Sequence, residues 1–127
     1  MMKSSIKVLI SALLASQVLL AGAARISSDA LLKQAPQKAL EQKNPYAGNN
    51  EARVAGKKLF MRHCAECHGE DGRGSEDAPT LQSDTVRSAS PGALVWFLKN
   101  GNLRRGMPSW SRLPEAQLWQ IVTHLQD

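Results

Sequence analysis

Two cysteines and a histidine lie together near the middle of the chain, in the order Cys64-Ala65-Glu66-Cys67-His68. Two thiols three positions apart on a turn of helix can each add to one vinyl group of a haem, which forms two thioether bonds. This attachment brings the next side chain, the imidazole of His68, beneath the iron as an axial ligand. The motif therefore predicts one haem that is covalently bound through Cys64 and Cys67.

Three other uses of two neighbouring cysteines are conceivable. A redox-active dithiol typically follows a strand and opens a helix, whereas here the expected helix comes first and a glycine-rich loop follows. A structural zinc ion needs four ligands, and the chain offers only two cysteines and three histidines without zinc-finger spacing. A plain disulfide would suit a small exported domain. The histidine directly after the second cysteine favours haem.

The first 23 residues have the pattern of a signal peptide. Lys3 and Lys7 give a positive start, the apolar run 8–20 follows, and residues 21–23 (Ala-Gly-Ala) supply the small side chains that a signal peptidase reads. The apolar run is too short to cross a bilayer comfortably, since a spanning helix needs about 20 residues. We expect cleavage near Ala23 and a periplasmic mature protein without a membrane span. Retention of the segment as an uncleaved anchor is the alternative.

The charge of the chain does not point to nucleic acid. The formal net charge of the whole sequence is +5, and the signal peptide carries two of the basic residues. The other lysines and arginines form no clustered stripe with interleaved aromatic residues, which is the pattern that follows phosphates. Haem propionates would bring the charge nearer to zero. We therefore expect protein partners and no nucleic acid.

Length and composition favour one small domain after the signal peptide. Only 5% of the residues are aromatic, so the core is small, and a large flat apolar cofactor at the centre would relieve that shortage. Residues 24–49 are polar and include Pro36, Pro45 and Gly48, which predicts a flexible lead-in with room for one helical turn. The domain proper is expected at residues 50–127.

Three segments of this domain carry helix patterns. Asn50 is a reasonable N-cap for a helix over residues 51–61, whose apolar residues fall on one stripe. Gly56 in that stripe weakens the helix by ~1 kcal/mol relative to Ala, so we expect it to permit a close helix crossing. Pro91 opens a second helix and Pro114 opens a third. No segment shows convincing strand alternation, and the predicted fold class is all-α with long loops.

Residues 50–125 resemble the small monohaem cytochromes c, including relatives that are fused to respiratory oxidases and quinoprotein dehydrogenases or serve as their subunits. The matching blocks are Gly56 with Phe60, Cys64 to Gly69, Gly72-Arg73-Gly74, Ala78-Pro79-Thr80-Leu81 and Gly106-Met107-Pro108-Ser109-Trp110. The lead-in lies outside the resemblance. The resemblance implies the cytochrome c fold, in which the first and last helices cross around one covalently attached haem.

The resemblance implies roles for residues on the proximal side of the haem. Cys64 and Cys67 would hold the porphyrin, and His68 would be the proximal iron ligand. The carbonyl of Pro79 would accept a hydrogen bond from the second ring nitrogen of His68, which orients the imidazole and raises its basicity. Leu81 would pack on the proximal face.

On the distal side, the resemblance makes the thioether of Met107 the second axial ligand. A thioether stabilises ferrous iron and raises the reduction potential relative to two histidines. The other methionine of the domain, Met61, lies three residues before Cys64 on the same helix and could hardly reach the opposite face. Ligation by His124 is the alternative. Trp110 is assigned to haem binding through a hydrogen bond from its indole to a propionate, and a hydrophobic plug is the competing role.

These features predict a carrier that passes single electrons and is not an enzyme. Two axial ligands leave the iron no open site, and no general base, nucleophile or substrate pocket is identifiable. The expected partners are redox proteins, with a dehydrogenase as donor and an oxidase or another protein as acceptor, and the expected state is a monomer. The candidate docking charges are Lys57, Lys58, Arg62, Arg104 and Arg105.

Two other functions are open at this point. If Met107 did not bind the iron, the open site would suit a haem enzyme or a gas-binding protein. The chain could also be a bound electron-accepting subunit of a dehydrogenase or an oxidase, with residues 24–49 as its docking arm.

Overall fold

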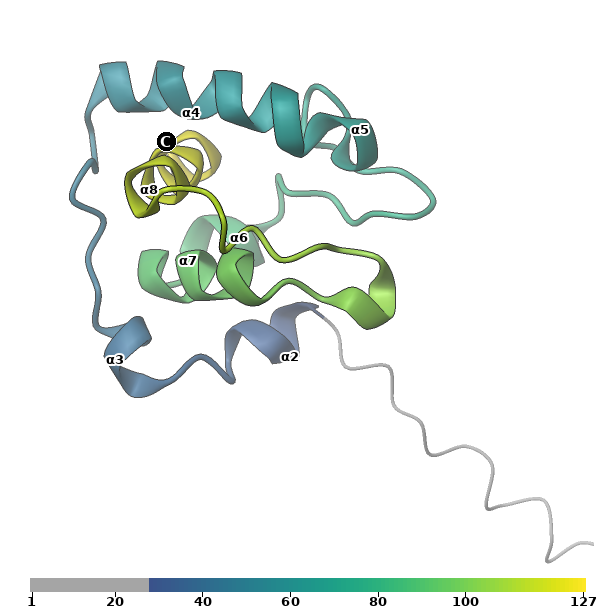
Figure 1. Cartoon of the computed structure of the whole chain (residues 1–127), viewed down its shortest axis with the longest axis horizontal. Coiled ribbons are helices and arrows are strands. Elements are labelled where there is room, and N and C mark those ends of the chain that lie inside the picture. Colours follow the sequence, from purple (N-terminus) through teal and green to yellow (C-terminus); the bar gives the residue numbers. More distant parts are fainter. Residues whose placement is uncertain (1–27) are drawn as a thin grey trace, which may run out of the picture.

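The structure is a computed structural model, and it describes residues 28–127 as a helical fold (Figure 1). In chain order its elements are α2 (Ser28–Leu32), α3 (Gln37–Leu40), α4 (Asn50–His63), α5 (Ala65–His68), α6 (Asp84–Ser88), α7 (Pro91–Asn100), the 3₁₀ turn η1 (Leu103–Arg105) and α8 (Glu115–Gln126). The described residues contain no strand beyond a single isolated bridge between Asn102 and Met107. The predicted all-α fold class is confirmed.

The predicted signal peptide, residues 1–23, lies outside the described residues. Within residues 28–127, no helix combines the length and the apolar character that a membrane crossing needs.

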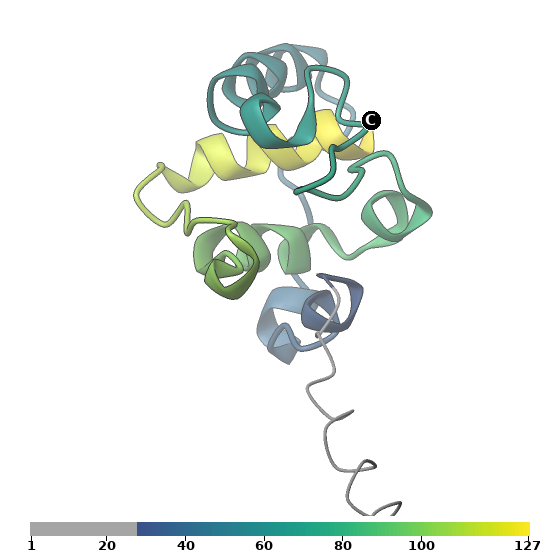
Figure 2. The same cartoon turned by 90° about the vertical axis from the view of Figure 1, so that its right-hand side faces the viewer.

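The two long helices α4 and α8 cross each other. In Figure 1 α4 runs across the top of the view, and α8 lies beneath it and is seen almost along its axis. In Figure 2 α4 is seen almost along its axis, and α8 runs across the view. Gly56 stands at the crossing, where a Cβ atom would overlap the carbonyl oxygen of Gln120 and lie 3.1 Å from the Cβ of His124. The close crossing expected at Gly56 is therefore confirmed.

Helix α4 begins at an N-cap one residue earlier than expected. The side chain of Asn49 accepts a hydrogen bond from the backbone N–H of Ala52 (2.9 Å), which satisfies one of the free donors of the first turn. The helix then runs to His63, the residue directly before the cysteine motif. The buried side chains on α4 include Phe60, which is only 1% exposed.

The main core lies beneath the crossing, between α7 and α8. Its buried members are Val86, Leu94, Val95, Leu98, Leu118, Trp119, Ile121 and Val122. Helix α7 is apolar on most sides because it is enclosed, with α8 on one side and α2 and α3 on another. It begins at Pro91, as the sequence predicts, and it ends at Asn100.

The segment before α4 packs on the domain, whereas the sequence predicts a flexible lead-in. Ala35 and Ala39 are buried against Ala93 of α7, and Leu32 and Trp96 pack beside them. The contact surfaces are small residues on two short helices, which leave no long apolar period in the sequence. For this reason the packing was not foreseeable from the pattern of residues 24–49.

Helix α6 is not among the helices that the sequence predicts. Its clearest local signal is Ser83, whose hydroxyl accepts a hydrogen bond from the backbone N–H of Val86 (3.3 Å) as an N-cap. The side chain of Val86 then enters the core. Five residues are too few for an apolar period to be visible.

The crossing predicts the effect of a single methyl group at Gly56. Gly56→Ala should lower the free energy of unfolding by about 1–3 kcal/mol, the usual cost of overpacking, although Ala is the better helix former by ~1 kcal/mol. Urea denaturation of the haem-loaded protein would measure this loss. Lys58→Ala, on the exposed side of the same helix, is the matched control and should stay within about 0.5 kcal/mol of wild type. Equal stability of Gly56→Ala and wild type would contradict the close crossing.

His124 also lies in this crossing, with its ring 5.3 Å from the ring of Phe60. Burial, and then the positive charges of Lys57 and Arg53, lower the pKa of His124 from its ordinary 6.5. As the pH falls below about 6.5, His124 therefore binds a proton in the unfolded chain but stays neutral in the folded protein. The free energy of unfolding decreases until the pH reaches the pKa of His124 in the folded protein.

His124→Gln should remove this part of the pH dependence. Between about pH 7 and about pH 5.5, the variant should lose less stability than wild type, as measured by urea midpoints at the two pH values. The same loss in both proteins would show that His124 is not held neutral at the crossing.

Candidate cofactor site

The cysteine motif forms one tight helical turn that follows directly on α4. The backbone N–H of Cys64 still donates to the carbonyl of Phe60 (2.8 Å), and the chain then bends into α5. The carbonyl of Cys64 in turn accepts from the N–H groups of Cys67 (3.2 Å) and His68 (2.9 Å). The two thiols and the imidazole therefore share one turn of helix, as a haem attachment requires.

Both cysteines are free thiols in the structure, Cys64 half-buried and Cys67 exposed. Burial, and to a lesser extent the neighbouring Cys67, raises the pKa of Cys64 to about 11. Redox-active dithiols depend instead on a lowered pKa that supplies thiolate at neutral pH. This environment does not favour the dithiol alternative.

The ring of His68 is buried and tied to one backbone carbonyl. Its side chain is 8% exposed, and Nδ1 lies 2.9 Å from the carbonyl oxygen of Pro79. Because a carbonyl can only accept, Nδ1 is the donor in this contact, and in the neutral ring the lone pair is then on Nε2. A histidine that binds a metal through Nε2 commonly has this second contact, since it fixes the tautomer and the orientation of the ring.

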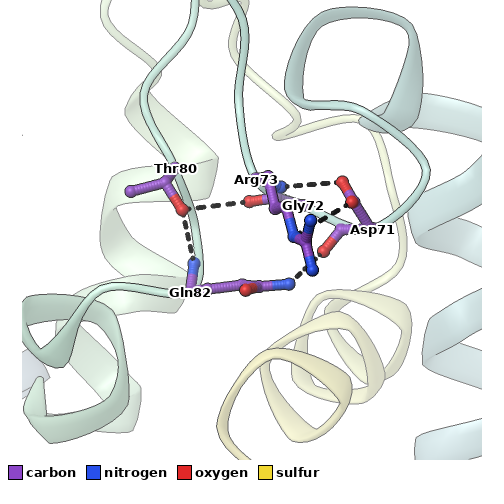
Figure 3. Close-up of polar contacts among 5 residues, drawn as sticks. All are labelled: Asp71, Gly72, Arg73, Thr80 and Gln82. Carbon is purple, nitrogen blue, oxygen red and sulfur yellow. Dashed lines mark hydrogen bonds and ion pairs between the residues drawn. The ribbon is translucent and has the colours of Figure 1, made fainter.

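The loop that carries Pro79 is closed by its own hydrogen bonds (Figure 3). Nε2 of Gln82 donates to the carbonyl of Asp71 (2.6 Å), and Oγ1 of Thr80 donates to the carbonyl of Gly72 (3.4 Å). The guanidinium of Arg73 folds back on Asp71, with Nε 3.3 Å from Oδ2. Residues 71–73 and 80–82 are thus joined, and Pro79 lies on the short stretch between them.

Glycine is required inside this loop at Gly74. Its φ is +88°, and a Cβ atom would lie 2.6 Å from the carbonyl oxygen of Ala78 and 2.7 Å from the backbone nitrogen of Thr80. The N–H of Gly74 also donates to the carbonyl of His68 (2.8 Å). The Pro79 carbonyl therefore reaches His68 only because the chain passes this closely.

Met107 lies in a second loop, which leaves the end of α7. Its backbone pairs with Asn102 through two hydrogen bonds, Asn102 N–H to the Met107 carbonyl (2.9 Å) and Met107 N–H to the Asn102 carbonyl (3.1 Å). The Met107 side chain is half-buried and packs against the main core. In Figure 1 α5 and η1, the turn within this loop, lie on the same side of the molecule.

The residues present fit a c-type haem. One turn supplies two free thiols and a buried imidazole whose Nδ1 is already occupied, and a soft thioether donor lies on a separate loop. Within residues 28–127, no group of three or more His, Cys, Asp or Glu side chains is arranged to hold a metal ion, which gives the zinc alternative no support.

Comparison with known proteins agrees with this donor set. Residues 51–125 match the family described as cytochrome c oxidase, cbb3-type, subunit III. The chain belongs to this family of c-type cytochromes. Among curated proteins, none matches the cytochrome.

A solved structure with a similar fold is cytochrome cL from the marine methylotrophic bacterium Methylophaga aminisulfidivorans. The two proteins are 28% identical, and the TM-score is 0.56. The match covers 65% of the chain described here and 57% of the chain of cytochrome cL. The cytochrome thus spans little more than half the length of that relative. The similarity supports the predicted cytochrome c fold.

The remaining candidate residues of the cytochrome lie as follows. Leu81 is half-buried and packs against the main core, and its N–H donates to the carbonyl of Gly72 (2.8 Å). Trp110 is half-buried, with its ring 5.1 Å from the ring of His63. His63 is itself half-buried, and the sequence gives no signal for this ring contact. The predicted hydrogen bond from Trp110 to a propionate stays a prediction.

The Pro79 loop predicts a specific response to Gly74→Ala. The variant should lose the positive φ and the close passage together, which we expect to lower the free energy of unfolding by about 3 kcal/mol. Gly48→Ala is the matched control, because φ is +70° there but nothing lies within 4 Å of the added Cβ. It should cost only the backbone term of about 1 kcal/mol. Urea denaturation of both variants measures the difference, and equal losses would contradict the tight passage at Gly74.

Proposed function

We propose that this cytochrome is a periplasmic single-electron carrier with one covalently attached haem c, and that His68 and Met107 are its axial iron ligands. One observation carries the proposal: His68, which lies on the same helical turn as the two thiols, donates a hydrogen bond to the carbonyl of Pro79. This contact fixes an imidazole with its free nitrogen available for a metal. Membership of a c-type cytochrome family supports the same conclusion.

A bound haem would supply an iron that alternates between the +2 and +3 states. The task of the chain is to keep the surroundings of that iron unchanged in both states. Cys64 and Cys67 would hold the macrocycle through their sulfur atoms, and the Pro79 carbonyl restrains rotation of the His68 ring. The Asn102–Met107 backbone pair holds the thioether loop in one conformation. Little reorganisation is needed when an electron arrives or leaves.

The surface beside Met107 suits acidic redox partners. Arg104 and Arg105 are exposed on η1, and Leu103 next to them is 75% exposed. The chain has no acidic residue from position 85 to position 114. A basic surface around an apolar point speeds encounter with an acidic protein and makes the association rate fall with salt.

The description of the matching family favours one further candidate role. It names a subunit of an oxidase, so the cytochrome could serve as a bound subunit of a respiratory complex. Co-purification with partner subunits at high salt would support this role. A monomer that exchanges electrons with soluble proteins would support the free carrier.

The ligand assignment predicts a spectroscopic difference between two methionine variants. The oxidised wild type should show the charge-transfer band of a methionine bound to ferric haem iron, and Met107→Ala should lack it. Met61→Ala is the matched control, because Met61 is exposed on α4 and should leave the band intact.

Carbon monoxide separates the carrier from an open-site protein. Reduced wild type should bind carbon monoxide slowly or not at all, and reduced Met107→Ala should bind it readily. High-spin oxidised wild type, without the band, would overturn the proposal and favour a haem enzyme or a gas-binding protein.

A further inference from the structure

The lead-in, here residues 28–49, lies outside the residues that match the cytochrome family, yet it is tied to the domain at separate points. The hydroxyl of Ser90 donates to the carbonyl of Leu40 (2.7 Å). Nδ2 of Asn44 donates to the hydroxyl of Thr123 on α8 (2.9 Å), which is 0% exposed. The inner face of the lead-in is therefore occupied by the domain itself, and this face is not free to bind a partner.

The closest of these contacts lies at the first turn of α7. A Cβ atom at Gly92 would overlap the carbonyl oxygen of Ala39 and lie 2.7 Å from the Cβ of Gln42. Ser90 is the N-cap residue of α7, but its side chain makes no capping hydrogen bond and binds Leu40 instead. Gly92 and the hydroxyl of Ser90 thus contribute to the contact with the lead-in, and neither stabilises the first turn of α7.

The middle of α7 is covered by the same segment. Trp96 and Leu32 pack against the small cluster formed by Ala35, Ala39 and Ala93. Leu94, Val95 and Leu98 of α7 are buried in the main core with α8. Helix α7 is therefore held between α8 and the lead-in.

The other end of α7 carries the Met107 loop. The N–H of Trp110 donates to the carbonyl of Leu98 (2.8 Å), and the hydroxyl of Ser109 donates to the carbonyl of Lys99. The loop that holds Met107 is thus suspended from the last turn of α7. Any tilt of this helix moves the loop with it.

We propose that the lead-in is a positioning segment for the distal ligand: it clamps α7 against α8 and so holds the Met107 loop in place. This inference rests on the proposed ligation of iron by Met107. A bond between a loop residue and a metal opens when the loop moves away, and a firmer support lowers the population of the open form. The segment therefore keeps the iron six-coordinate, which favours electron transfer over the binding of external ligands.

Two substitutions loosen this clamp without touching the site. Gly92→Ala places a methyl group where the Ala39 carbonyl lies, and Ala favours the helical state of α7 itself. Ser90→Ala removes the hydrogen bond to Leu40. Ser88→Ala is the matched control, because the Ser88 hydroxyl donates to the Asp84 carbonyl within α6.

The full haem-loaded protein is followed by two measurements. The first is the rate at which added imidazole displaces Met107 from oxidised iron, seen as loss of the charge-transfer band. The second is hydrogen exchange at the amide of Trp110, which reports on the loop without reference to the iron. In the Gly92→Ala/Ser90→Ala double variant both rates should rise about tenfold, which equals ~1.4 kcal/mol in the opening equilibrium. Both should stay at the wild-type value in Ser88→Ala.

Exchange at the amide of Glu41, which donates to the Gln37 carbonyl in α3, shows whether the lead-in has been released. Faster exchange there with unchanged imidazole and Trp110 rates would overturn the proposal. If the Glu41 amide stays protected, the two substitutions have not released the lead-in, and the same two rates are then measured in a chain that lacks residues 28–42. Unchanged imidazole and Trp110 rates in that chain would also overturn the proposal. Absence of the charge-transfer band in wild type would instead count against ligation by Met107, while Trp110 exchange would still test the clamp.

Discussion

Two thiols and an imidazole must share a single helical turn, and the described structure is arranged around that constraint. The position of the turn from Cys64 to His68 depends on α4, which leads directly into it. Helix α4 is placed by its crossing with α8, and the absence of a side chain at Gly56 allows that crossing. The imidazole is then fixed from the other side by the Pro79 carbonyl. Local chemistry at the motif thus depends on contacts between segments far apart in sequence.

The strongest local patterns of the sequence predicted the parts of the fold that form by local rules. Pro91 and Pro114 mark the starts of α7 and α8, and an asparagine cap marks the start of α4 within one residue. The cysteine motif and the glycine of the crossing were recognisable because each has a distinct physical requirement. In these places propensity, capping and packing all favour the same structure.

Other features depend on contacts that leave no period in the sequence. The lead-in packs through Ala39 against Gly92, a contact between small residues that becomes visible only when α7 is in place. Helix α6 is short, and its N-cap at Ser83 is followed by too few residues to show an apolar period. The ring contacts of His63 with Trp110 and of His124 with Phe60 join segments many residues apart. Tertiary packing decides such features.

The proposed ligands and the proposed role of the lead-in would together explain how a small domain can favour electron transfer. Of the two proposed ligands, His68 is held by a loop closed on itself, and Met107 lies on a loop that is hydrogen-bonded to the last turn of an enclosed helix. Both supports consist of hydrogen bonds to backbone carbonyls and of packed side chains, which would not change with the charge of a bound iron. Such a site needs little rearrangement between its two oxidation states, and a site that opens easily would suit catalysis or gas binding better.

The proposed electron carrier requires thioether bonds from Cys64 and Cys67 to one haem. Mass spectrometry of the mature protein, produced together with haem-ligation machinery and extracted with acidified organic solvent, tests whether these bonds form. We expect one haem mass to be retained on the peptide that contains residues 64–68, with neither thiol open to alkylation. A colourless protein with free thiols, or with a disulfide between the two cysteines, would contradict it.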